Sequence, residues 1–177
     1  QSGKKGDLRD PSAQVLQTEA SGEVTYGNDL VVLDASHTAD GYVMICYNGS
    51  NEKVKIQVTS PDGTEYTYPV TVVGDYAVYP LPGGNGSYKV TLLESVSVDD
   101  NLYAVSFTQD LDVQITDEFA PFLHPNYYVN FTADSKCVKK GESLAGKDCY
   151  SDLDVVTQIY NFVIKNRLMG ILVNKEN

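Results

Sequence analysis

The chain contains the run Lys53-Val54-Lys55-Ile56-Gln57-Val58-Thr59, in which polar and apolar side chains alternate strictly. A period of two is typical of a strand with one buried face, here the face of Val54 and its alternate neighbours. Ser60-Pro61-Asp62-Gly63 follows and predicts a tight turn, because proline presets φ and glycine accepts a positive φ. Residues 64–72 form the predicted return strand, in which Pro69 favours an edge position.

Further runs of this kind lie at regular spacing on both sides of this hairpin. They cover residues 30–33, 41–47, 75–79, 88–94 and 102–115. About seven short strands separated by turn residues, with no helical period among them, are typical of a sandwich or a barrel. We therefore expect a mainly β fold, an immunoglobulin-like β-sandwich over residues 22–116. Gln109-Asp110 interrupts the longest run and predicts a bulge or a change of sheet there.

A second local pattern favours the sandwich. The run Gly84-Asn85-Gly86-Ser87-Tyr88-Lys89-Val90 places small residues before a tyrosine and an apolar residue two positions after it. In immunoglobulin-type domains, a tyrosine at such a corner bonds through its hydroxyl to backbone a few residues upstream. Tyr88 is expected to do the same; the alternative is an ordinary hairpin with a tyrosine at the start of its strand. Val90 stands where antibody domains place a cysteine, so their inter-sheet disulfide is not expected.

Charge and composition exclude several classes of partner. The chain has 13 Lys and Arg against 24 Asp and Glu, a formal net charge of −11. Phosphate-rich partners require clustered cations, so neither nucleic acid nor an anionic membrane surface is expected. No apolar run approaches the roughly 18–20 residues that a membrane-spanning helix needs. With only 2 His and 3 Cys, neither a metal nor another cofactor is expected.

The two ends of the chain differ from its middle. Residues 1–21 are polar without periodicity and are interpreted as a flexible leader. Residues 117–177 are interpreted as a linker followed by a C-terminal helix, with little regular structure in 117–146. The helix begins after Ser151, a favourable N-cap, and its apolar stripe contains Leu153, Val156, Tyr160 and Val163. We expect this stripe to pack on the sandwich or against a second copy, which would give a homo-oligomer.

The groups that could carry chemistry are few, and each has a structural interpretation. Cys46 lies in mid-strand and is expected to be a buried small residue, because no cation or helix N-terminus is near it in the sequence. Cys137 and Cys149 form a disulfide across a short loop or stay as two thiols. His37 is expected in a loop and His124 at a packing contact, rather than as general bases. The acidic pairs are interpreted as solvated surface rather than as calcium ligands: Asp99-Asp100, Asp110 and Asp112, Asp117-Glu118, and Asp152 and Asp154.

The sequence therefore assigns no catalytic, cofactor-binding or metal-ligating residue, and we do not expect an enzyme. The 13 Tyr have two interpretations. Tyrosine suits a pleated surface, where the ring is buried and the hydroxyl stays wet, and it is also common on surfaces that bind sugars or peptides. Sheet packing is the preferred interpretation.

Two segments after the strands resemble a known family. They are Phe119-Ala-Pro-Phe-Leu-His-Pro-Asn-Tyr-Tyr-Val129 and Ser151-Asp-Leu-Asp-Val-Val-Thr-Gln-Ile-Tyr-Asn-Phe-Val-Ile-Lys-Asn166. They look like the lead-in to the transglutaminase-like domain of secreted or surface proteins of Gram-positive bacteria. In that family an Ile-Tyr-x-Phe/Tyr-Val helix opens the papain-like catalytic core, and an all-β domain often precedes it. The resemblance covers less than a third of the chain, and none of the family's catalytic Cys, His and Asp falls on a residue of this sequence.

The resemblance implies a non-catalytic extracellular interaction or accessory module. It would lie outside the cytoplasm, secreted or attached to the cell surface (as a lipoprotein, for example), with a protein or a cell-wall glycan as partner. Two alternatives stay open: a fragment of a full transglutaminase-like cysteine amidase or peptidase whose catalytic residues lie beyond Asn177, and a stand-alone adhesin that binds glycans or proteins. The sequence encoded after Asn177 tests the first alternative, and a glycan array tests the second.

Overall fold

The computed structural model describes residues 15–97, 101–146 and 149–173. The chain divides into two compact units, one of residues 16–130 and a smaller one that includes the described residues from Phe131 onward. The larger unit carries the eight strands of the described residues, and the smaller unit carries two helices.

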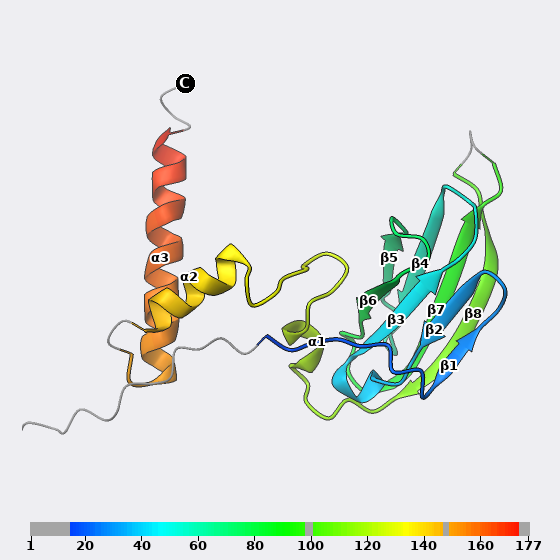
Figure 1. Cartoon of the computed structure of the whole chain (residues 1–177), viewed down its shortest axis with the longest axis horizontal. Coiled ribbons are helices and arrows are strands. Elements are labelled where there is room, and N and C mark those ends of the chain that lie inside the picture. Colours follow the sequence, from blue (N-terminus) through cyan, green and yellow to red (C-terminus); the bar gives the residue numbers. More distant parts are fainter. Residues whose placement is uncertain (1–14, 98–100, 147–148, 174–177) are drawn as a thin grey trace, which may run out of the picture. The chain divides into compact units, whose positions relative to one another are not determined.

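The larger unit is built from two antiparallel sheets of four strands each (Figure 1). The first sheet has the spatial order β1 (Thr25–Gly27), β2 (Val31–Asp34), β3 (Tyr42–Tyr47) and β6 (Tyr76–Pro80). The second has the order β5 (Glu65–Pro69), β4 (Val54–Thr59), β7 (Gly86–Ser95) and β8 (Tyr103–Val113). Between β1 and β8, the described residues contain one helical element, the 3-10 turn η1 (Thr38–Asp40). The prediction of a mainly β fold is confirmed.

Side chains from both sheets meet in one buried core. In β4, Val54, Ile56 and Val58 are at most 4% exposed, while Lys55 and Gln57 are partly exposed, which confirms the alternation predicted for this run. The first sheet contributes Val31, Leu33, Val43, Ile45, Tyr47 and Tyr79 to the same cluster. The two sheets therefore enclose a single hydrophobic core.

Each sheet has an edge strand that ends at a proline. β5 pairs only with β4 and ends at Pro69, as that proline predicted. β6 pairs only with β3 and ends at Pro80. Proline is tolerated at such positions because an edge strand has N–H groups that no ladder uses.

Tyr88, at the start of β7, makes the hydrogen bond that the sequence predicted. Its hydroxyl lies 2.9 Å from the carbonyl oxygen of Gly84 and 3.1 Å from that of Leu81. The ring is fully buried in the core. The side chain thus ties the start of β7 to the turn that precedes it.

Two details of the strands differ from the prediction. The bulge lies at Ser106 rather than at Gln109-Asp110, because Leu92 pairs with Phe107 while its neighbour Leu93 pairs with Val105. The extra residue reverses the faces, so Val105 is 62% exposed while Phe107 packs against the core. β8 pairs with β7 along its whole length and does not change sheet.

β1 was not predicted, because its three residues are all exposed and show no alternation.

Both faces of β3 are buried, because a second layer covers the face turned away from the core. Met44 and Cys46 on that outer face are 9% and 7% exposed. The cover comes from residues 16–22 and 116–130: the N–H of Glu19 donates to the Tyr42 hydroxyl at 3.3 Å, and the His124 ring lies against the Tyr42 ring. The compact unit therefore spans 16–130, whereas the sequence analysis placed the sandwich at 22–116.

Residues 117–146, expected to be irregular, contain two helices. The four-residue α1 (Ala120–Leu123) brings Pro121 so close to Gly41 that a Cβ there would lie 2.4 Å from the proline Cγ. α2 (Lys136–Ala145) has no fully buried residue and packs against α3 (Asp152–Val173), where the Lys140 ammonium lies 4.7 Å from the centre of the Phe162 ring. In such a helix most of the stability comes from tertiary packing of one face rather than from intrinsic propensity.

α3 begins as the sequence predicted. The Ser151 hydroxyl accepts the N–H of Asp154 at 3.3 Å, and the Asp154 carboxylate accepts the N–H of Ser151 at 2.9 Å, a reciprocal cap. Leu153, Val156, Tyr160 and Val163 are between 51% and 72% exposed, so the predicted stripe is uncovered among the described residues. None of the described helices combines the length and the apolar character that crossing a bilayer would require.

Candidate functional site

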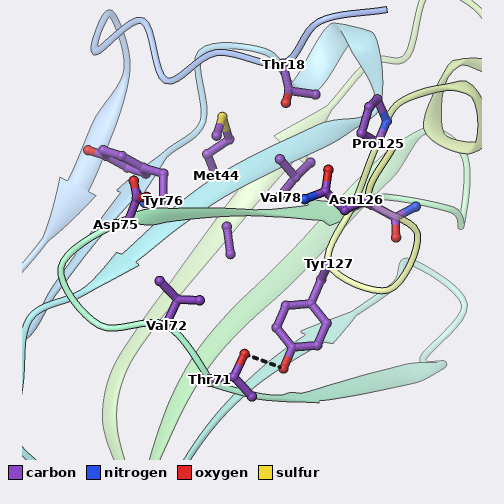
Figure 2. A pocket seen from close by; sticks show the side chains of 12 residues that line it. Thr18, Met44, Thr71, Val72, Asp75, Tyr76, Val78, Pro125, Asn126 and Tyr127 are labelled. Atoms are coloured by element: carbon purple, nitrogen blue, oxygen red, sulfur yellow. Dashed lines mark hydrogen bonds between the residues drawn. The ribbon is translucent and has the colours of Figure 1, made fainter. Parts of the chain in front are cut away.

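A pocket of about 380 Å³ lies beside β6 on the larger unit (Figure 2). Its walls come from four separate parts of the sequence: the N-terminal stretch, β3, the β5–β6 loop with β6, and the segment after α1. The lining residues are Thr18, Met44, Thr71, Val72, Asp75, Tyr76, Ala77, Val78, Pro125, Asn126, Tyr127 and Asn130. Pockets of this size hold small ligands or one or two side chains of a larger partner.

The floor is the outer face of the first sheet. Met44 pairs with Val78, and Cys46 pairs with Tyr76, so these side chains are cross-strand neighbours on that face. The run of residues 42–47 lacks the polar alternation of β4 and is buried on both sides. Because this run has apolar side chains on both sides, the outer face of the sheet is apolar. The covering segments pack on part of it, and the pocket lies over another part.

Tyr127 forms one wall and joins the two sheets. Its backbone N–H donates to the carbonyl oxygen of Val78 in β6 at 2.9 Å. Its hydroxyl donates to the carbonyl oxygen of Pro69 at the end of β5 and lies 3.3 Å from the Thr71 hydroxyl, the contact drawn in Figure 2. Tyr127 therefore spans the opening between the edge strands β5 and β6.

Behind this wall, four tyrosines pack together. The Tyr127 ring stacks on Tyr79 with centroids 5.7 Å apart and meets Tyr68 edge to face. Tyr128 contacts the rings of both Tyr68 and Tyr127. Burial raises the pKa of Tyr68 to about 12 and also raises the pKa of Tyr79. Both phenols stay neutral at physiological pH, which suits a packing role.

Among the described residues, the pocket has one charged lining residue. The Asp75 carboxylate faces it and accepts a hydrogen bond from the Tyr76 N–H at Oδ1, at 2.8 Å. No lysine or arginine of that part of the chain lines it. Since the whole chain also carries a net charge of −11, the field around the pocket favours neutral or cationic groups over anions.

Cys46 lies on the pocket side of β3 but is shielded. Burial raises the pKa of its thiol, and the charge of Asp75 raises it further. The thiol donates to the Asn48 side-chain oxygen at 3.4 Å. A protonated, shielded thiol is a poor nucleophile, in line with the interpretation of Cys46 as a buried small residue.

The structure brings both histidines to one tyrosine. The His37 ring stacks on Tyr42 with centroids 5.4 Å apart, and His124 lies against the same ring at 5.0 Å. His37 Nδ1 is 3.0 Å from the Asp40 carboxylate, and His124 Nδ1 is 2.9 Å from the Ala120 carbonyl oxygen. His37 lies in a turn and His124 at a packing contact, where the sequence analysis placed them. Their shared contact with Tyr42 was not predicted.

The remaining candidate residues lie apart from the pocket lining. Cys137 is exposed and Cys149 is buried, and both are free thiols, so the disulfide alternative is not what the structure has. Asp110 and Asp112 are exposed on β8, Asp117 accepts the N–H of Phe119, and Asp154 caps α3. Asp99-Asp100 lies outside the described residues. Within the described residues, no group of three or more His, Cys, Asp or Glu side chains is placed to hold a metal ion.

Sequence reasoning did not find the pocket. Thr18 lies in the predicted leader and Asn126 in the predicted linker, and neither stretch has a period that places it on a sheet. The available signal was the pair Tyr127-Tyr128 shortly after the last strand, where adjacent exposed aromatic residues would be costly unless they packed. No family model, no curated protein and no solved structure matches this chain.

Proposed function

We propose that this chain is a non-catalytic interaction module and that the pocket beside β6 is its binding site. The observation that carries the proposal is a preformed pocket over an apolar floor, in which the described lining residues supply one carboxylate and no cation. Such a site accepts a neutral or cationic group of a protein or a glycan. Cys46, the thiol on the pocket side of β3, supports binding rather than catalysis, because burial raises its pKa and leaves it a poor nucleophile.

Within this proposal the larger unit is an immunoglobulin-like sandwich. Two antiparallel four-stranded sheets around one core support it, as does the Tyr88 hydroxyl bonded to its preceding turn. Domains of this architecture commonly act as binding modules on cell surfaces, which favours an extracytoplasmic location.

The proposed relation to transglutaminase-like proteins rests on the segments 119–129 and 151–166. In support of it, α3 begins at Asp152, directly after the Ser151 cap, where the resemblance puts the first helix of that family. The proposal makes the chain an accessory module related to that family, with the partner's chemistry set by the pocket.

Charge reversal at Asp75 tests the binding function. The intact chain, Asp75→Lys and the control Asp112→Lys would be applied at low salt to arrays of neutral glycans, peptidoglycan fragments and short peptides. Asp112 is exposed on β8, at the edge of the second sheet opposite β5, so its reversal makes the same change in net charge away from the pocket. We expect binding by the parent and the control that Asp75→Lys weakens at least about tenfold. Absence of binding to every probe, or equal binding by all three proteins, contradicts the proposal.

A further inference from the structure

We infer that the pocket takes an extended peptide, which adds as a further strand to the part of the β6 edge that Tyr127 leaves unpaired. The inference deepens the proposed function and rests on it, because it names the class of partner for the same pocket. It starts from the direction in which the backbone groups of β6 point.

Alternate residues of a strand direct their N–H and C=O groups to opposite sides. Just after β6, the N–H of Leu81 donates to the carbonyl oxygen of Gly41, directly before β3, at 2.8 Å. Leu81 therefore faces β3, and so do the odd-numbered residues Ala77 and Tyr79. The even-numbered residues face the other way, toward the edge that no strand covers.

Tyr127 confirms this direction and already uses part of the edge. Its N–H donates to the carbonyl oxygen of Val78 from the side opposite to β3. The Tyr76 N–H is also occupied, by the Asp75 carboxylate. Two backbone groups remain on this edge: the N–H of Val78 and the carbonyl group of Tyr76. Neither has a hydrogen-bond partner in the described part of the chain.

These two groups belong to residues that line the pocket. The N–H of Val78 and the carbonyl group of Tyr76 lie on either side of Ala77. A neighbouring strand can bond to both of them, with one backbone carbonyl oxygen and one backbone N–H of its own. An unpaired strand edge beside a preformed pocket is the arrangement that strand addition uses, with main-chain bonds for affinity and a pocket for one side chain. A glycan can bond to the same groups, but it has no backbone that repeats with the spacing of the edge.

Charge specifies the side chain that enters. Asp75 is the charged residue of the described lining, and Tyr76 and Tyr127 contribute aromatic side chains to the same lining. A pocket with one carboxylate and aromatic walls suits a lysine or arginine side chain, whose stem lies on apolar surface and whose cation pairs with the carboxylate. The occupant is therefore an extended peptide that carries a basic residue and flanking uncharged residues.

Pro80 shows how a hydrogen-bond donor can be removed from this edge without disturbing the sheet. Pro80 occupies an even-numbered position of β6, where its missing N–H costs no bond to β3. Val78→Pro repeats that arrangement two residues earlier and deletes the edge donor, while Val78→Ala keeps the donor and only shortens the side chain.

The experiment applies the intact chain to positional-scanning pools of end-capped heptapeptides, with neutral oligosaccharides in parallel. We expect pools with a central Lys or Arg to bind and pools with Asp or Glu at that place to fail. For the best peptide, Val78→Pro weakens binding about tenfold while Val78→Ala changes it less than about threefold, as the loss of one interfacial hydrogen bond implies.

Peptide chemistry gives a second test that needs no variant. In an extended peptide, the N–H groups of alternate residues point to opposite sides, and only one side faces the edge of β6. N-methylation of the residues whose N–H groups face the edge should therefore abolish binding, whereas N-methylation of the alternate residues should not. Hydrogen exchange at the Val78 amide should be fast in the free chain, between the slower amides of Ala77 and Tyr79, and should slow at least about tenfold with peptide bound.

The outcomes separate the two proposals. If only oligosaccharides bind, and Asp75→Lys weakens them, the inference is wrong and the proposed function stands. If no probe binds, both are wrong. Binding of a peptide that tolerates N-methylation of either set and leaves exchange at Val78 unchanged also overturns the inference.

Discussion

The backbone N–H of Tyr127 donates to the carbonyl oxygen of Val78 at 2.9 Å, so a residue fourteen positions after the last strand, which ends at Val113, pairs with the edge of β6. The hydroxyl of the same tyrosine donates to the Pro69 carbonyl oxygen at the end of β5. The two sheets are thus joined at their edges by one residue that belongs to neither.

Substitutions of Tyr127 should separate its two contacts. Tyr127→Phe loses the hydroxyl bond and keeps the ring, for an expected loss of about 1 kcal/mol in the free energy of unfolding. Tyr127→Ala also removes the packing on Tyr79 and Tyr68, for a loss of about 3 kcal/mol. Urea unfolding of the intact chain measures both values. Equal losses would mean that the ring contributes nothing.

Tyr88→Phe should destabilise the larger unit by about 1–2 kcal/mol. The ring would stay in place, but the carbonyl oxygen of Leu81, which is buried, and that of Gly84 would lose their donor. Tyr66→Phe is the matched control, since Tyr66 is 36% exposed on β5. Its effect should stay within about 0.5 kcal/mol. A loss no larger for Tyr88→Phe than for Tyr66→Phe would refute the structural role given to the Tyr88 hydroxyl.

Low pH should lower the free energy of unfolding through protonation of the Asp34 carboxylate. Burial opposes the charge of this carboxylate, but hydrogen bonds from Ser36 and from the Gly22 N–H outweigh it and lower its pKa. A lowered folded pKa contributes stability above the unfolded value of about 3.9, and that contribution is lost as the pH falls further. Asp34→Asn should therefore be less stable than the parent by about 1–3 kcal/mol at pH 7. The difference should shrink as the pH falls from about 5 to about 3. Urea midpoints across this range test it, and a constant difference would contradict it.

High pH should destabilise the folded state through ionisation of the Tyr68 phenol. Its folded pKa of about 12 lies above that of an unfolded tyrosine, so the stability that its neutral form contributes is present below about pH 10 and is lost as the pH rises toward 12. Tyr68→Phe should shift alkaline unfolding, followed by circular dichroism and phenolate absorbance, to higher pH. An unchanged midpoint would show that this phenol does not govern the transition.

We expect self-association through α3. Leu153, Val156, Tyr160 and Val163 are all more than half exposed, and an apolar patch of this kind usually marks an interface. The double variant Val156→Lys, Val163→Lys and deletion of residues 151–177 should both lower the number of chains per particle, which is the mass from light scattering at high concentration divided by the mass of each chain. A parent that is monomeric at that concentration, or a number of chains that neither change affects, would contradict this expectation.

The sequence predicted those features of the fold that depend on neighbouring residues. β4 follows from its alternation, the edge position of β5 from Pro69, and the start of α3 from Ser151. The bulge was misplaced because the residue that loops out is chosen by pairing with β7, which the sequence of β8 does not contain. Gln109 and Asp110 are paired residues whose polarity alone suggested an interruption.

The pocket could not be predicted for a similar reason. Thr18, Met44, Asp75 and Tyr127 come together only because the stretches before β1 and after β8 lie on the outer face of the first sheet. Nothing periodic in those stretches indicates which face they cover. Besides the pair Tyr127-Tyr128, the run 42–47 was a local hint, since it has too few polar residues for a strand with one solvent-exposed face.

The contacts that Tyr127 makes with β5 and β6 also set the order in which the surface is covered during synthesis. A ribosome has placed all eight strands once Val113 has emerged, yet the opening between β5 and β6 stays uncovered until Tyr127 follows. At translation rates of about 5–20 residues per second, that interval lasts about one to three seconds. During this time the nascent sandwich exposes the Tyr68 and Tyr79 rings and the whole edge of β6. A chaperone or a neighbouring nascent chain therefore meets the whole of this edge only until Tyr127 has emerged.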